Sequence, residues 1–210
     1  LEVDTLALGG HPEAAIGVRL GGDDLHVCDD PTSAPENVRR ATDDEGFPAF
    51  RRWLLRKGVV EQPLCDAHWA RRADRLVAGA ARRGGRHDAP APRSTHLELM
   101  PGEYAPADLL AEADGGLYLH EIARGQLDPL TGAFQLVFAH GRRITGGHIG
   151  DPVGPCRLQG HVADLLGAIV GIGREVHAAG AGWCAKDGLR VPVWATAPAL
   201  RLEGLRVAEA

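Results

Sequence analysis

The chain has 210 residues, 44% of them apolar, which is enough to bury one substantial core or two small ones. Its formal net charge is −5 with acidic and basic residues interspersed, which argues against the concentrated cationic surface that nucleic-acid binding needs. No apolar run approaches the roughly 20 residues of a membrane-spanning helix, so we expect neither nucleic acid nor a membrane as a partner.

The first half of the chain predicts short elements separated by polar turns. They are a helix over 1–8, a strand over 25–28, a hairpin formed by 50–55 and 59–64, and a helix over 67–80. The first helix should end at Gly9-Gly10, because glycine suits the left-handed position after a helix end. The arginine pairs at 51–52, 71–72 and 82–83 are short, and we interpret all three as solvated.

The second half is more regular, and residues 94–210 form the most regular β-rich part. Its predicted elements are strands over 95–99, 117–122, 134–140, 189–195 and 199–207, with helices over 106–112 and 162–170. Strands joined by short turns, with a few helices between them, predict an α+β fold with mainly antiparallel sheet. The stretch 81–93, rich in Arg, Gly and Pro, predicts an irregular loop, and no domain boundary is evident.

One sequence feature suggests a metal site but lacks the required spacing. His120-Glu121 begins like the HExxH motif, in which two histidines one helical turn apart bind zinc. No second histidine follows, and the segment alternates as a strand does. We therefore interpret this pair as structural. The other histidines, such as His26, His68 and His161, also lack the spacing of metal ligands.

The four cysteines form no CxxC pair, so reduced thiols in a cytoplasmic protein are the simplest interpretation. Cys184 is distinct because it lies in the glycine-rich segment 180–188, which predicts a turn where backbone approaches a ligand closely. Lys186 nearby could lower the pKa of the thiol and favour the metal-binding thiolate. The alternative is that Cys184 is a small buried hydrophobic residue.

Several short motifs follow one another over almost the whole chain. They are acidic turns at 28–32 and 43–46, a hairpin at 54–60, a glycine-arginine loop at 85–88, a Pro-Arg-Ser-Thr-His run at 92–96, turns at 125–128 and 131–134, and the segments 184–188, 191–193 and 198. Their order resembles the C-terminal part of TldD-type proteins in the TldD/TldE (PmbA, modulator of DNA gyrase) metallopeptidase family. His96 departs from the asparagine usual there.

This resemblance implies a zinc site. In TldD-type proteins, two histidines of an HExxxH helix and a distant cysteine hold the metal, and Cys184 matches that cysteine. Residues Leu1-Glu2-Val3-Asp4 look like the continuation of the HExxxH motif, so the two histidines and the catalytic glutamate are expected just upstream of Leu1. Residues 1–10 would then be the tail of the metal-site helix in a C-terminal domain spanning 1–210. Glu2 and Asp4 would either orient the metal ligands or be solvated helix residues.

The resemblance also implies an activity, namely hydrolysis of short or unfolded peptides beside a homologous TldD/TldE-type subunit. Arg93 and Lys186 are candidates for the substrate groove, where a sheet edge could bind an extended peptide by strand addition. One alternative is a non-catalytic TldE-like partner, although such partners generally lack the Cys-x-Lys-x-Gly signature at 184–188. Another is a peptidase dedicated to one natural-product precursor. The residues themselves give no sign of DNA contact.

Overall fold

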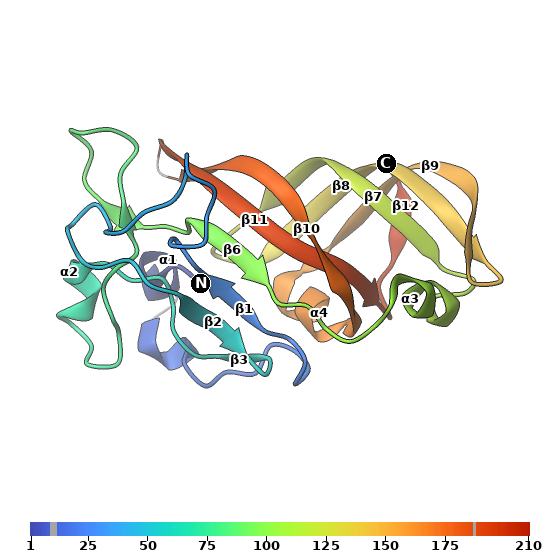
Figure 1. The fold of residues 1–210 in the computed structure, drawn as a ribbon, viewed down its shortest axis with the longest axis horizontal. Coiled ribbons are helices and arrows are strands. Elements are labelled where there is room, and N and C mark those ends of the chain that lie inside the picture. The colour runs from blue at the N-terminus through green and yellow to red at the C-terminus, as the bar shows by residue number, and fades with distance from the viewer. Residues whose placement is uncertain (9–11, 187) are drawn as a thin grey trace. The chain divides into compact units, whose positions relative to one another are not determined.

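A computed structural model describes residues 1–8, 12–186 and 188–210, and it has the expected α+β fold with mainly antiparallel sheets (Figure 1). The chain divides into two compact units. Unit 1 comprises Leu1–Arg19, Asp23–Met100 and Val176–Ala197, and unit 2 comprises Leu20–Gly22, Pro101–Glu175 and Pro198–Ala210. Each unit is assembled from separate stretches of chain, which explains why no boundary is visible in the sequence. Within the described residues, no helix is long and apolar enough to cross a membrane.

Unit 1 is built around a six-stranded sheet with the strand order β10-β11-β6-β1-β2-β3. The elements are α1 (Val3–Leu8), a 3-10 turn (Pro12–Ala15), β1 (Val27–Asp29), β2 (Arg52–Arg56), β3 (Val59–Val60), α2 (Ala67–Ala70), β4 (Ala81–Arg82), β5 (Ala91–Pro92), β6 (His96–Leu99) and the greater parts of β10 (Ile169–Lys186) and β11 (Leu189–Leu202). The start of β10, up to Glu175, and the end of β11, from Pro198, belong to unit 2. β11 pairs with β6 in parallel, whereas β1 is antiparallel to both of its neighbours.

The predicted hairpin is confirmed as β2 and β3. Lys57 and Gly58 both adopt positive φ angles, 51° and 68°, at the turn between the two strands. Glycine adopts this left-handed conformation without steric cost, and two consecutive positive φ angles match the twist of the strands that they join. A local signal of this kind can be recognised without any knowledge of the tertiary structure.

The predicted helix over 67–80 is wrong beyond its first turn. α2 begins after Asp66, whose side chain accepts a hydrogen bond from the backbone N–H of Trp69, and it already ends at Ala70. Leu76 instead packs with Val3 and Cys65 in a buried apolar cluster. This tertiary burial outweighs the local helical spacing on which the prediction was based.

Helix α1 is anchored to unit 1 by the same cluster. Val3 is fully buried, and its N–H donates to the carbonyl of Leu64 over 2.9 Å. Glu2 forms an isolated parallel bridge with Leu64. The helix is therefore held in a fixed position, and the residues beside Val3 are fixed with it. The helix end predicted at Gly9-Gly10 lies outside the described residues.

Two of the arginines expected to be solvated are buried. Arg52 and Arg82 are each 2% exposed. Arg52 donates to the carbonyl of Ala78 over 2.9 Å, and Arg82 donates to the carbonyls of Ser94 and Pro192 over 2.9 and 2.8 Å. These bonds to backbone oxygens offset part of the cost of removing a guanidinium from water.

A buried carboxyl group holds the start of β6 against β1. Asp29 Oδ1 accepts hydrogen bonds from the backbone N–H groups of Thr95 and His96, both 2.8 Å long. Burial raises the pKa of Asp29 to about 7, and this effect exceeds the opposing effects of the two amides and of nearby Arg52 and Arg82. The folded state consequently binds a proton at Asp29 more tightly than the unfolded chain does.

We expect this carboxyl group to make the protein less stable as the pH rises. The contribution of Asp29 is fully present below its unfolded pKa of about 3.9 and is lost by pH 7, a change of roughly 3–4 kcal/mol. Asp29→Asn should keep an oxygen for both amides and remove this pH dependence, as measured by urea unfolding at pH 5 and pH 8. Asp30→Asn is the control, because hydrogen bonds from Thr32 and Arg51 outweigh burial and lower the pKa of Asp30. An unchanged pH dependence in Asp29→Asn would contradict this account.

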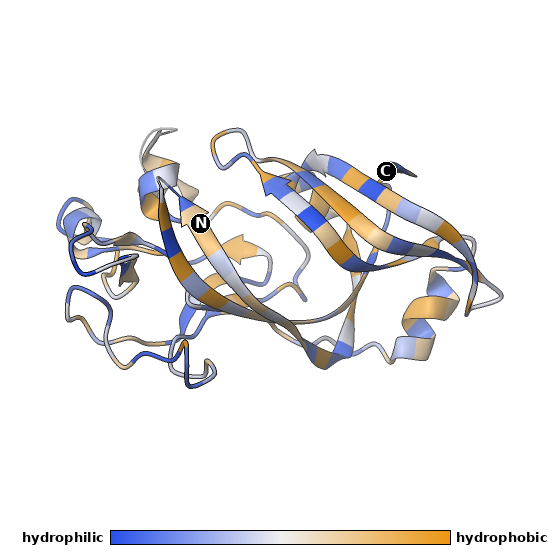
Figure 2. Ribbon diagram, turned by 90° about the horizontal axis from the view of Figure 1, so that it is seen from above, coloured by the Kyte–Doolittle hydropathy of each residue, from blue (hydrophilic) through white to orange (hydrophobic). Residues whose placement is uncertain are grey.

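Unit 2 contains a four-stranded sheet with the order β12-β9-β8-β7. Its elements are α3 (Pro106–Glu112), β7 (Leu117–Leu127), β8 (Ala133–Thr145), β9 (His148–His161), α4 (Val162–Gly167) and β12 (Val207–Glu209). Figure 2 shows polar and apolar residues alternating along the long strands. The strands predicted over 117–122 and 134–140 are confirmed and extend further than the sequence indicated.

Three predictions in the C-terminal region are corrected by the structure. The helix predicted over 162–170 already ends at Gly167, and the last predicted residues belong to β10, which begins at Ile169. The two strands predicted over 189–195 and 199–207 are largely one continuous strand, β11, which ends at Leu202. The sequence analysis also missed β9, a strand interrupted by Gly and Pro residues.

Candidate functional site

The segment around Cys184 is a strand rather than the predicted glycine-rich turn. β10 continues to Lys186, and exposure alternates along its last residues. Cys184 and Lys186 are half-buried and share one face with Gly180 and Gly182, whereas the residues between them are exposed. Because side chains in a strand alternate between its two faces, Cys184 and Lys186 both face the interior of unit 1.

Lys186 connects the end of β10 to the first residues of the chain. Its Nζ donates to Glu2 Oε2 over 2.9 Å and to Asp4 Oδ1 over 2.5 Å. The side chains of Lys186, Glu2 and Asp4 are only 17%, 17% and 24% exposed. One ammonium group thus bridges two carboxylates in a partly desolvated position, where charge-assisted hydrogen bonds are stronger than at the surface.

Arg93 lies buried beside this ion pair, with 1% of its side chain exposed. One of its terminal nitrogens lies 3.4 Å from Glu2 Oε2, and the other donates to the backbone carbonyl of Lys186 over 3.1 Å. The guanidinium therefore joins residue 2 to residue 186. Its burial does not favour direct contact with a substrate, and the place of Arg93 in a substrate groove stays a prediction.

The Cys184 thiol faces Glu2, with 4.0 Å between Sγ and Oε1. Burial raises the pKa of Cys184, and the Glu2 carboxylate acts in the same direction. Arg93, Lys186 and Arg82 act in the opposite direction without overcoming burial. The sequence-based expectation that Lys186 gives Cys184 a lowered pKa is therefore wrong. Cys28 and Cys65 are more strongly affected, since burial raises the pKa of each to about 12.

A catalytic zinc site takes about three protein ligands. Within the part of the chain that the structure describes, no group of three or more His, Cys, Asp or Glu side chains is placed to hold a metal ion. The half-buried thiol of Cys184 nevertheless suits zinc, which binds thiolate readily, and it faces the chain segment that carries Glu2. The donor set thus fits one position of a zinc site, and the remaining ligands would come from outside the described residues.

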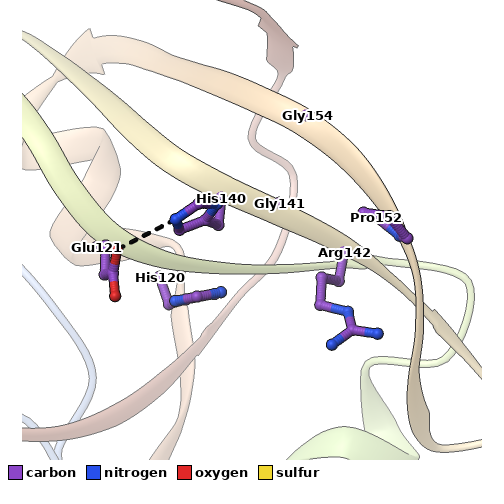
Figure 3. A pocket seen from close by; sticks show the side chains of 7 residues that line it. All are labelled: His120, Glu121, His140, Gly141, Arg142, Pro152 and Gly154. Atoms are coloured by element: carbon purple, nitrogen blue, oxygen red, sulfur yellow. Dashed lines mark ion pairs between the residues drawn. The ribbon is translucent and has the colours of Figure 1, made fainter.

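A second group of polar side chains lies on unit 2, around a cavity of about 450 Å³ (Figure 3). His120 on β7 and His140 on β8 stand opposite each other with ring centroids 5.2 Å apart. Glu121 Oε2 lies 3.3 Å from His140 Nε2, and Glu121 has a φ angle of 58°. His120 and Glu121 therefore lie on a strand, as their alternation predicted, and the two rings stack instead of converging on a common point.

Two residues beside Cys184, Arg82 and Trp183, were not identified as neighbours of the candidate site from the sequence. Arg82 is buried and donates to Pro192 on β11, and Trp183 is 62% exposed on the opposite face of β10. The residues next to Arg82 in the sequence do not indicate that it is buried, because its hydrogen-bond partners lie 12 and 110 residues away. Trp183 could have been identified from the alternation of β10 if that strand had been recognised.

Comparisons with known proteins all point to one family. Residues 11–209 match the PmbA/TldA metallopeptidase C-terminal domain. The chain is 28% identical over 182 residues to the metalloprotease TldD homolog of Buchnera aphidicola from Schizaphis graminum, covering 86% of this chain and 38% of that protein. It is 30% identical over 195 residues to a metalloprotease of Methanothermobacter thermautotrophicus, covering 93% of this chain and 42% of that protein. The chain therefore spans about two fifths of the length of these relatives.

Two solved structures share the fold. A Thermotoga maritima protein described as a modulator of a DNA gyrase superposes with a TM-score of 0.78 at 25% identity, covering 99% of this chain and 44% of that protein. TldE from Thermococcus kodakarensis also gives a TM-score of 0.78, at 19% identity, covering 99% of this chain and 45% of that protein. The second likeness is evidence of the fold alone.

Proposed function

The chain belongs to the PmbA/TldA metallopeptidase family, in which it matches the C-terminal domain, and on this premise we propose that it supplies Cys184 as one ligand of a peptidase zinc site. The observation that carries the proposal is the position of Cys184, whose half-buried thiol faces the chain segment bearing Glu2. The two histidines and the general base would come from an HExxxH helix preceding Leu1. Zinc bound there would polarise the scissile carbonyl and activate water.

The residues around Cys184 would hold the two parts of this site together. Lys186 would fix Glu2 and Asp4 at the end of the metal-binding helix, and Arg93 would fix Glu2 to the backbone of β10. Glu2 would in turn orient the ligating groups through its carboxylate. Residues that position metal ligands in this way are typically worth about 10- to 100-fold in metal affinity.

The proposed substrate is a short or unfolded peptide bound in extended form. β10 carries Cys184 and is the terminal strand of the six-stranded sheet. A peptide could therefore add to this edge through main-chain hydrogen bonds, which give affinity with little side-chain specificity. We further propose a homologous TldD/TldE-type subunit as partner. Four free thiols favour a reducing compartment such as the cytoplasm.

Two alternative functions remain distinguishable from this one. A non-catalytic TldE-like subunit would bind peptides without a metal, and the presence of Cys184 with Lys186 favours the catalytic type. A peptidase dedicated to one natural-product precursor would discriminate strongly between peptides of similar length. The proposed general peptidase would instead let unrelated extended peptides compete with one another.

The proposed function is tested by comparing two forms of the protein. The chain extended through its upstream segment should cleave unstructured peptides and lose this activity when a chelator removes the metal. Residues 1–210 alone should be inert and should bind zinc weakly, because one thiolate cannot provide the roughly three protein ligands of a catalytic site. Chelator-sensitive cleavage by residues 1–210 alone would place all the ligands within this chain and would disprove the proposal.

A further inference from the structure

The outer edge of β10 is covered at one end and open at the other. Near its start, Gly102 N–H donates to Gly173 O, and Arg174 N–H donates to Tyr104 O, both over 2.9 Å. In the described part of the chain, no second strand pairs with β10 on this side from Val176 onward. The open stretch leads directly to Cys184.

This open edge lacks the charged residues and the proline that often protect a sheet edge. Residues 176–185 contain no Asp, Glu, Lys, Arg or Pro. Natural edge strands are usually protected from pairing by charged residues, by proline or by bulges. An uncharged, exposed edge of ten residues is suited to accept an added strand, and its position beside Cys184 favours an extended peptide as that strand.

Trp183 is the largest exposed side chain of this stretch. Its neighbours on the same face are Ala181 and Ala185, and Trp183 is 62% exposed. The guanidinium of Arg190 on β11 lies 5.2 Å from the centre of its ring. This cation–π contact ties the ring to β11, the inner neighbour of β10. Most of the indole nevertheless stays exposed, so its surface is accessible to a side chain of an added strand.

The opposite face of β10, which carries Cys184 and Lys186 and faces the interior of unit 1, has no side chains at Gly180 and Gly182. A methyl group built at Gly182 would touch only a side-chain carbon of Val193, at 3.6 Å. Gly180 has a φ angle of 102° and no atom within 4 Å of the corresponding position. Side chains of an added strand would therefore meet an aromatic ring on the exposed face, whereas the other face offers no side chain at Gly180 and Gly182.

We propose that Trp183 is a specificity-determining residue, which selects an aromatic or large aliphatic side chain at one position of an extended peptide bound along the β10 edge. This inference rests on the proposed peptidase function. Residues opposite each other on neighbouring strands interact, and aromatic pairs do so most strongly. The preference should be roughly two- to fivefold, since a single exposed cross-strand pair contributes no more than that. A preference of this size is compatible with the otherwise loose specificity of strand addition.

The test uses the protein with its upstream segment and a set of equal-length peptides that carry Phe, Leu, Ser or Gly at successive positions. At one position, Phe and Leu should lower KM roughly two- to fivefold relative to Gly. Trp183→Ala should reduce this ratio to near one, whereas Trp183→Phe should retain most of it. Leu130→Ala is the control, because Leu130 is similarly exposed, at 66%, in a turn of unit 2. Thermal unfolding of each variant verifies that it is folded.

The possible outcomes separate this inference from the proposed function. If the wild-type protein cleaves peptides and Trp183→Ala keeps the full preference, the role of Trp183 is disproved and the peptidase proposal stands. If no peptide is cleaved, the peptidase proposal fails, and fluorescence anisotropy with the same labelled peptides still measures whether Trp183 selects side chains in binding. If Trp183→Ala changes only the subunit stoichiometry in size-exclusion chromatography, the edge belongs to a partner subunit and the inference is overturned.

Discussion

Cys184→Ala should abolish zinc binding and lower peptidase activity at least about a hundredfold, in the protein that carries the upstream HExxxH segment. Zinc with only two histidine ligands is held weakly, because a catalytic site takes about three protein ligands. The expected zinc content after dialysis, measured by elemental analysis, falls from near one per chain to near zero.

The other cysteines provide matched controls for this experiment. Cys28, Cys65 and Cys156 are free and buried. Replacing any of them by alanine removes a small apolar side chain from a core, so some stability is lost. Zinc content and turnover should nevertheless stay at the wild-type level. Full zinc occupancy in Cys184→Ala would refute the assignment of this residue as a ligand.

The second large effect is expected for Arg93, on stability. Arg93→Met should lower the free energy of unfolding by about 2–4 kcal/mol, because it removes one of the two cationic partners of Glu2 and leaves the carbonyl of Lys186 without its buried donor. Urea unfolding measures this change. The variant should also bind zinc more weakly, since Glu2 is then held to the end of β10 by Lys186 alone. The free energy of unfolding of Arg93→Lys should lie between those of the wild-type protein and Arg93→Met, because an ammonium group cannot reach both partners as the guanidinium does.

A surface arginine on the same unit serves as the control. Arg56 pairs with Glu61 at 3.0 Å, but their side chains are 49% and 41% exposed. Exposed ion pairs contribute little to stability, so Arg56→Ala should change the free energy of unfolding by less than about 0.5 kcal/mol. Its zinc affinity should be unaltered. If Arg93→Met were as mild as Arg56→Ala, the guanidinium would not hold the two parts of the site together.

Elements with a strong local signal could be predicted from the sequence. The hairpin of β2 and β3 has its turn at Lys57-Gly58, and α3 has a proline in its first turn. The strands β9 and β10 were missed because Gly, Ala and Pro weaken the alternation that identifies a strand. Helix α2 was overestimated because the burial of Leu76 depends on residues distant in sequence.

The candidate site residues came from the family resemblance, and the contacts between them could not be predicted. The resemblance to TldD-type proteins singled out Cys184, Glu2 and Asp4, and unit 1 brings Glu2 close to Cys184. The ion pairs of Lys186 with Glu2 and Asp4 span more than 180 residues of sequence. Arg93 could not be recognised as buried, because its partners are 91 and 93 residues away. Whether a charged side chain is buried depends on such partners, which a single sequence does not reveal.

Cobalt substitution tests whether Cys184 binds the metal. The protein with its upstream segment is depleted of metal, loaded with Co²⁺ and examined by near-ultraviolet absorption, where a thiolate bound to cobalt gives a charge-transfer band. We expect the wild-type protein and Cys156→Ser to show this band, and Cys184→Ser to lack it. A band of undiminished intensity in Cys184→Ser, or no band in the wild-type protein at full cobalt occupancy, would contradict the account.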